Sequence, residues 1–155
     1  MKIRYATQAD IPAMLEIGRS IHAESRFSAM AYDVEKLRTE LGYLLQLQEK
    51  NGSHCFLVAV NQQGKIVGGF IGALETYFFT RAVSANSILI WVSPAARGSS
   101  AAVRMIDVFR RWAIKNRAME VCLLVASGVT INRTDRFFRK LGFVQTGGNY
   151  SLAVA

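Results

Sequence analysis

The stretch WVSPAARGSSAAVRMI, residues 91–106, decides the fold class because it joins a strand to a helix through a run of small side chains. The segment before it, Ser87–Val92 (SILIWV), is the most β-prone in the chain. After it, apolar residues at helical spacing predict an amphipathic helix from about Gly98 to Asn116. Glu120–Ala126 is another apolar strand. The helix therefore links two strands that are predicted to be parallel neighbours through a right-handed crossover.

The segments on either side of this unit also predict a single α/β domain over residues 1–155. Upstream, hydrophobic periodicity and turn residues predict a strand over Lys2–Ala6, a helix that starts at Thr7 or Asp10 and continues to about His22, a helix from Asp33 to about Lys50, and a hairpin of strands Cys55–Val60 and Ile66–Phe79. Downstream, they predict a helix over Thr130–Leu141 and a closing pair of strands over Phe143–Val154. The predicted order is βααβββαβαββ, a mixed sheet that is mostly antiparallel.

The composition is that of a folded domain with an uneven charge. Of the 155 residues, 51% are hydrophobic, which is enough to form a core and excludes disorder. The formal net charge is +8. Residues 1–80 hold eight basic and eight acidic side chains, whereas residues 81–155 hold eleven basic and three acidic ones. A basic half is often only a solvated surface, but it can also attract an anionic ligand.

Other sequence features exclude several classes of protein. Cys55 and Cys122 cannot form a disulfide framework, and both lie in apolar runs typical of buried thiols. His22 and His54 lack the spacing of metal ligands, so no metal is expected. The N-terminus lacks the apolar stretch of a signal peptide, and no run approaches the roughly 18 apolar residues of a membrane span. These features predict a soluble cytoplasmic protein that does not bind membranes.

The segment from Gly98 to Ala102 predicts a phosphate-binding turn. Its side chains are small, so a ligand can approach the backbone, and the first N–H groups of a helix are unpaired. Further phosphates would then lie near basic side chains, for which the candidates are Arg97, Arg104, Arg133 and Arg139. The alternative is a tight strand-to-helix turn whose small residues serve only packing.

At this turn the chain resembles the GNAT family of N-acetyltransferases. The family's motif is Arg or Gln, two residues, Gly, one residue, then Gly or Ala, and Arg97 to Ala102 follows it with Ser100 in place of the first Gly. Val92 and Pro94 precede the turn at the family's spacing. The opening segment IRYATQADIPAMLEI (residues 3–17) is similar to the family's first strand and helix, and FFRKLGF (residues 137–143) to its fourth helix and next strand.

The resemblance implies a fold with helices on both faces of a sheet whose fourth and fifth strands splay apart after a bulge. It also implies acetyl-coenzyme A as cosubstrate, with the pantetheine arm lying between those strands. The residues that would bind it are Ile90, Trp91 and Val92 through the backbone, Arg97, Gly98, Ser99, Ser100, Ala101 and Ala102 around the diphosphate, and Asn132 and Phe138 beside the arm. The Trp91 side chain can equally be a core residue.

The implied reaction is transfer of an acetyl group to a primary amine of a small molecule, peptide or protein, by direct attack on the thioester. The N–H of Val92 would polarise the carbonyl. Glu75 is the candidate base, with His22 and Glu24 as alternatives. The family's usual acid is a Tyr, but Phe138 stands at that position, so Tyr150, Ser127 or a water would have to replace it.

Two other functions compete with this one. Phe138 and the lack of an unambiguous base are compatible with an inactive module that only binds acyl-coenzyme A. Nucleic-acid binding through the basic half is disfavoured, because the sequence lacks the motifs of known DNA- and RNA-binding modules. In the segments that set specificity in such folds, aromatic residues suggest an apolar or aromatic acceptor, although residues of this kind are more often part of a core: Phe27, Tyr32, Tyr77, Phe78 and Phe79. The predicted C-terminal strands can pair between two copies, which would give a homodimer.

Overall fold

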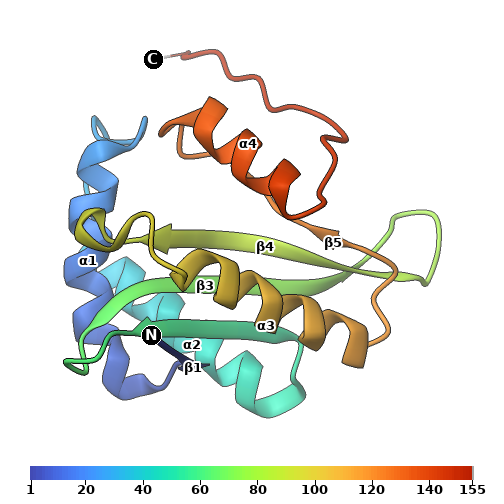
Figure 1. Ribbon diagram of the computed structural model, residues 1–155, viewed down its shortest axis with the longest axis horizontal. Helices are drawn as coiled ribbons and strands as arrows, with labels where there is room; N and C mark the ends of the chain where they lie inside the picture. The colour runs from blue at the N-terminus through green and yellow to red at the C-terminus, as the bar shows by residue number, and fades with distance from the viewer. Residues whose placement is uncertain (155) are drawn as a thin grey trace.

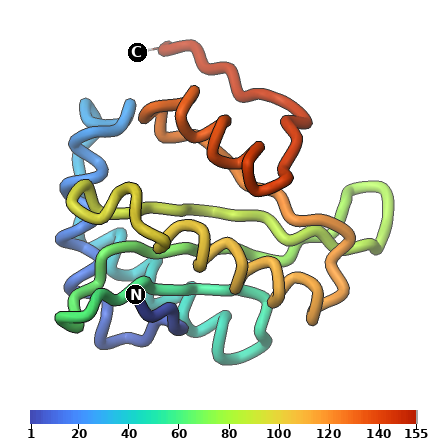
Figure 2. The backbone as a smooth tube through the Cα atoms, viewed as in Figure 1, coloured from blue at the N-terminus to red at the C-terminus, as the bar shows by residue number. Residues whose placement is uncertain are grey.

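The computed structural model describes residues 1–154, which form one mixed sheet covered by helices on both faces (Figures 1 and 2). The strands are β1 (Lys2–Tyr5), β2 (His54–Val60), β3 (Ile66–Thr76), β4 (Val83–Val92) and β5 (Val121–Cys122). The α-helices are α1 (Ile11–Glu24), α2 (Val34–Asn51), α3 (Ala101–Lys115) and α4 (Ile131–Lys140), and short 3-10 helices occupy Gln8–Asp10 and Pro94–Ala96. The strands lie in the order β1-β2-β3-β4-β5, and only the pair β4 and β5 is parallel.

The fold class predicted from the sequence is confirmed, and α3 is the crossover between the two parallel strands. One part of the predicted order is wrong, since residues 143–154 contain no strand. A strand needs the edge of a neighbour, and β5, which ends the sheet, has only two residues. The segment instead passes along the outside of α4 (Figure 2). At its start, the Phe143 ring lies 6.0 Å from the Phe138 ring, measured between centroids. The C-terminal strands expected to pair in a homodimer are therefore absent from the described residues.

Several strands begin or end at other residues than predicted. β4 begins at Val83 rather than Ser87, because its first residues pair with the end of β3. β3 ends at Thr76, before the predicted Phe79. β5 stops at Cys122 instead of Ala126, because the chain leaves β4 there.

Each face of the sheet has its own apolar core. On the face that α3 crosses in Figure 1, the buried side chains of α3 and α4 include Met105, Phe109 and Phe138. On the opposite face, α1 and α2 contribute Met14 and Leu45 among others. Glycines let the aromatic rings of these cores lie directly on β3. A Cβ at Gly72 would lie 2.4 Å from the Phe109 ring, and one at Gly69 would lie 2.1 Å from the Trp91 ring.

The two helices on the second face have well-defined starts. The Asp33 carboxylate accepts a hydrogen bond from the Lys36 N–H at 2.9 Å, which confirms it as the cap of α2. Before α1, the buried Asp10 carboxylate accepts two hydrogen bonds from Arg4, at 2.7 and 2.8 Å. The Arg4 guanidinium lowers the pKa of Asp10, so this ion pair fixes the junction between β1 and α1 near neutral pH.

Strand β4 contains the irregularity that shapes the site. Ile71 of β3 lies opposite Leu89, but Gly72 lies opposite Ser87, so Ile88 is an extra residue in β4. On its other side, β4 pairs with β5 only through Ala85 and Asn86. The two strands part after this point, as the resemblance implies.

No helix within residues 1–154 is long and apolar enough to cross a membrane.

Candidate functional site

The parting of β4 from the chain after β5 opens a cavity of about 540 Å³ that reaches both faces of the sheet. Its lining comes from the second half of β4, residues 124–127, α1, α2, the connection between these two helices, α4 and Asn149. Ile90, Val92 and Phe138 belong to the core on the α3 face, whereas Met14 and Leu41 belong to the core on the α1 and α2 face. The cavity therefore passes through the sheet and joins its two faces.

The backbone of residues 88–92 is free on the side that faces this cavity. Within residues 1–154, no backbone hydrogen bond joins residues 88–92 to residues 123–127. The Ser93 N–H donates to the Val67 carbonyl in β3. Because successive N–H groups of a strand alternate in direction, those of Ile90 and Val92 point away from β3 and toward the gap.

Ser87 marks the point where the gap begins. Its hydroxyl, in a side chain that is 1% exposed, accepts a hydrogen bond from the Leu124 N–H at 2.8 Å. This side chain replaces the backbone partner that Leu124 would have in a continued sheet. The sequence gives no sign of that role, since Ser87 is one of several serines in the segment.

Trp91 contributes to the cavity wall from the core. Its side chain is 7% exposed and packs with Met14 and Leu41 on the α1 and α2 face. The indole Nε1 is buried and has no hydrogen-bond partner within the described residues. The ring thus belongs to the core, and by the same alternation the Trp91 N–H points toward β3, so the cofactor contact predicted for Trp91 stays a prediction.

The turn before α3 has the geometry of an anion cradle. Gly98 has φ +87°, and a Cβ at this position would meet nothing within 4 Å. Most residues of the turn are exposed. Within residues 1–154, the N–H groups of Gly98, Ser100, Ala102 and Val103 have no hydrogen-bond acceptor. Unpaired amides at a helix start, open to solvent and free of covering side chains, fit a diphosphate.

The basic residues around the cradle have different partners. Arg97 forms an ion pair with Glu24 at the end of α1, with Nη2 and Oε2 2.5 Å apart. Arg104 donates to the Met1 carbonyl, and Arg139 is paired with Asp135 at 2.9 Å. Arg133 is exposed in the first turn of α4. The ion pair of Arg97 therefore ties the cradle to the C-terminal end of α1.

The two cofactor-flanking residues predicted in α4 differ in position. Phe138 is 9% exposed and lines the cavity. Asn132 is exposed in the first turn of α4 and is not part of the lining. Thr134 does line the cavity, and it was missed although its spacing of three and four residues from Phe137 and Phe138 places all three on one helix face.

The structure separates the two predicted catalytic residues from the cavity. Glu75 is exposed near the far end of β3, where its Oε2 accepts a hydrogen bond from the Asn86 amide at 2.6 Å. Tyr150 is 99% exposed beyond α4. The alternative base Glu24 is engaged by Arg97, whereas His22 is half-buried and lines the cavity.

Neither cysteine is placed for nucleophilic chemistry. Cys55 is fully buried, and burial raises the pKa of its thiol to about 12. Burial also raises the pKa of Cys122, with a smaller contribution from the Glu120 carboxylate. Within residues 1–154, no three His, Cys, Asp or Glu side chains are grouped so as to hold a metal ion.

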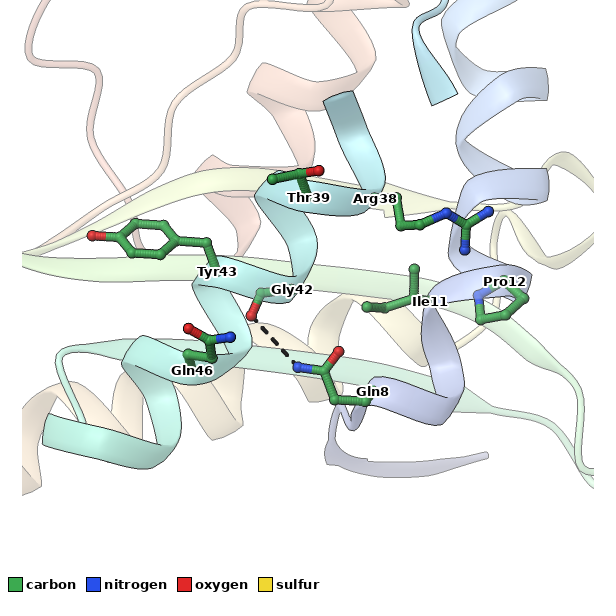
Figure 3. A pocket seen from close by; sticks show the side chains of 8 residues that line it. All are labelled: Gln8, Ile11, Pro12, Arg38, Thr39, Gly42, Tyr43 and Gln46. Atoms are coloured by element: carbon green, nitrogen blue, oxygen red, sulfur yellow. Dashed lines mark hydrogen bonds between the residues drawn. The ribbon is translucent and has the colours of Figure 1, made fainter. Parts of the chain in front are cut away.

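A second hollow lies on the outer surface between the start of α1 and α2 (Figure 3). The Gln8 amide spans it to the Gly42 carbonyl at 3.5 Å, and Arg38 and Tyr43 lie at its edges. It shares α1 and α2 with the larger cavity but no lining residue, and none of the candidate site residues lines it.

Comparison with known proteins agrees with this geometry. A family model described as an acetyltransferase (GNAT) domain matches residues 51–145. Among solved structures, an acetyltransferase from Trypanosoma brucei has a TM-score of 0.72 at 17% identity, with 99% of each chain covered. Glucosamine-6-phosphate N-acetyltransferase from Arabidopsis thaliana has a TM-score of 0.74 at 14% identity, with 99% of this chain and 98% of that chain covered. A ribosomal-protein-alanine N-acetyltransferase from Brucella melitensis has a TM-score of 0.71 at 16% identity, with 99% of each chain covered. A search of curated proteins found no significant match.

Proposed function

Because the chain belongs to the GNAT acetyltransferase family, we propose that it is a single-domain N-acetyltransferase that transfers the acetyl group of acetyl-coenzyme A to a primary amine. The observation that carries the proposal is the combination of an open anion cradle at Arg97–Ala102 with parted strands beside it. The cradle suits the diphosphate, and the free backbone of residues 88–92 suits the pantetheine arm, which pairs as a strand would.

Acetyl-coenzyme A supplies an activated acetyl group and a thiolate that leaves readily. The residues of the chain orient the bound thioester and polarise its carbonyl group. The Val92 N–H, which points into the gap, is the donor for the carbonyl oxygen. Ile90, Val92 and Phe138 surround that position with apolar side chains, which keep water from the reacting groups.

The amine must lose a proton before it attacks, because an alkylamine with a pKa near 10.4 is almost entirely protonated at neutral pH. His22 lines the cavity and is our choice for the group that takes this proton. Glu75, which the sequence predicts, is the alternative, and it would have to act from outside the cavity lining. Tyr150 as the acid likewise requires the segment after α4 to move, and a thiolate can leave without it.

Direct binding and turnover test this proposal. Acetyl-coenzyme A should raise the melting temperature of the protein, and a panel of primary amines should then release free thiol from it. Cys55 adds little background to a thiol reagent, because it is fully buried and burial raises its pKa to about 12, and a blank without amine corrects for the half-buried Cys122. Absence of cofactor binding would contradict the proposal.

A second candidate function is an acyl-coenzyme A binding module without turnover, favoured by a phenyl ring at Phe138 where the family has a phenol. Stabilisation by acetyl-coenzyme A without thiol release from any amine would support this module.

A further inference from the structure

We propose that the acceptor is a monoamine with an apolar body and no second positive charge. This inference rests on the proposed function and concerns the end of the cavity that lies between α1 and α2. That end is lined by Met14, Ile21, Phe27, Leu37 and Leu41. Their side chains offer an incoming molecule dispersion contacts and apolar burial, which favour a hydrocarbon or aromatic body.

The cavity contains no fixed charge to hold a second ammonium group. Of the 22 lining residues, all within the described part of the chain, none is Asp, Glu, Lys or Arg. A cation buried against such a wall would lose its hydration without gaining a partner, which is strongly unfavourable. Polyamines, aminoglycoside-like polycations and lysine-rich peptides are therefore poor candidates.

The charged side chains near this end lie outside the cavity lining. The Arg19 guanidinium lies 5.2 Å from the centre of the Tyr32 ring, and that of Arg26 lies 4.4 Å from the Phe27 ring. Both aromatic rings line the cavity, and the Glu16 carboxylate also acts on Tyr32, so the charges around this end are of both signs. The Glu24 carboxylate, the acidic group at the end of α1, is already paired with Arg97. None of these charged groups is part of the lining, so a second ammonium group inside the cavity would have no partner there.

The polar groups at this end are few and mostly occupied. The Tyr32 hydroxyl donates to the Leu15 carbonyl at 2.8 Å, and the Ser25 hydroxyl donates to the His22 carbonyl at 2.8 Å. The His22 ring, 5.2 Å from that of Tyr32, forms no hydrogen bond within residues 1–154. The single imidazole can take a proton from one amine, while the apolar lining contacts the rest of the molecule.

The reaction on such a substrate is balanced without a further reagent. The ammonium gives one proton to His22 or water, its nitrogen forms the C–N bond to the acetyl carbon, and the C–S bond breaks. The nitrogen then loses a second proton as the amide forms, and the thiolate takes up one proton to become a thiol.

Hexylamine and 1,6-diaminohexane form a matched pair of probes, because they differ only in the second amino group. We expect kcat/KM for hexylamine to be at least tenfold higher, corresponding to about 1.4 kcal/mol. A diamine used as well as, or better than, the monoamine would overturn the inference while confirming acetyl transfer. If acetyl-coenzyme A itself does not bind, the proposed function fails together with the inference.

A charge introduced into the wall should reverse the preference. Leu37→Glu is expected to lower the ratio of hexylamine to diaminohexane turnover at least tenfold, whereas Leu37→Gln should leave the ratio near its original value. Both variants place a polar side chain of similar size at the half-buried position 37 of α2, so they differ only in charge. Equal ratios in the two variants would contradict the assignment of this end to the acceptor.

Binding gives a readout that does not depend on turnover. With the protein saturated with coenzyme A, hexylamine should shift the NMR signal of the Trp91 indole N–H, assigned through Trp91→Phe, at concentrations at least tenfold below those of diaminohexane. If neither amine shifts this signal nor reacts while acetyl-coenzyme A still binds, the inference is wrong.

Discussion

The two halves of β4 differ in what they pair with. The closed half, Val83–Ser87, has β3 on one side and β5 on the other, whereas the open half, Ile88–Val92, has only β3. One extra residue, Ile88, separates the two halves, and the Ser87 hydroxyl holds the last neighbouring N–H. The bulge and the Ser87 side chain thus leave the second half of β4 with backbone N–H groups that have no neighbouring strand.

The side chains around the two halves of β4 also differ in character. At the closed half, polar groups satisfy one another: Asn86 donates to Glu75, and the Tyr77 hydroxyl donates to Glu120 at 2.5 Å. At the open half, the side chains are mostly apolar, and the polar groups without a partner in the described residues are backbone groups and the Trp91 indole N–H. The comparison predicts that substitutions around the open half affect catalysis and that those around the closed half do not.

The largest expected effect is on turnover, and it compares His22 in α1, which lines the cavity beside the open half, with Glu75 in β3, beside the closed half. His22→Gln should lower kcat/KM about 100-fold, because the imidazole lines the cavity and loss of a general base typically costs at least this much. Glu75→Gln should change kcat/KM little, because its carboxylate is held by Asn86 outside the cavity lining. Steady-state thiol release at neutral pH measures both variants.

Affinity for acetyl-coenzyme A is the control, and it should stay the same in the two variants. If Glu75→Gln lowers kcat/KM and His22→Gln does not, the base lies beside the closed half, as predicted from the sequence. The division between the two halves would then be wrong.

The next effect is on cofactor affinity and compares two glycines with similar backbones. Gly98 and Gly64 have φ of +87° and +77°, and a Cβ at either would meet nothing within 4 Å. Valine at either position should therefore cost similar stability, about 1 to 2 kcal/mol. Gly98→Val should also weaken acetyl-coenzyme A binding at least tenfold, about 1.4 kcal/mol, because its side chain projects into the cradle.

Calorimetric titration of both variants measures the difference, and circular dichroism shows whether they fold. If Gly64→Val weakens binding as much as Gly98→Val, the loss comes from general destabilisation and the cradle assignment is incorrect.

Most of the fold could be predicted from the sequence because local signals and packing agree. The small residues after Pro94, the amphipathic pattern of α3 and the Asp33 cap each specify one element. In the C-terminal segment, local signals alone do not predict the structure. Tyr150, Leu152 and Val154 alternate as strand residues do, yet they are 99%, 86% and 93% exposed, because pairing depends on a partner edge that β5 does not provide.

The candidate site could be predicted only in part. The cradle follows from the local sequence, so Arg97–Ala102 was identifiable. The surroundings of Glu75 depend instead on its partner across the sheet, and sequence alone does not show that Asn86 lies beside it. The apolar acceptor end is assembled from α1, α2 and the residues between them, whose contacts depend on how the helices pack.

The smallest expected effect tests whether the closed half is independent of the open one. The Glu120 carboxylate, just before β5, accepts a hydrogen bond from the Tyr77 hydroxyl, just after β3, and this raises the pKa of Tyr77 to about 12. The hydrogen bond requires a protonated phenol, so its contribution is complete below the ordinary tyrosine pKa of about 10 and is lost as the pH rises toward about 12. Glu120→Gln should return the Tyr77 titration toward pH 10, as followed by NMR of labelled tyrosines with Tyr77→Phe for assignment. Acetyl-coenzyme A affinity should be unchanged in Glu120→Gln, because Glu120 is not part of the cavity lining or the cradle. A change of threefold or more would show that the closed half controls how far the strands part.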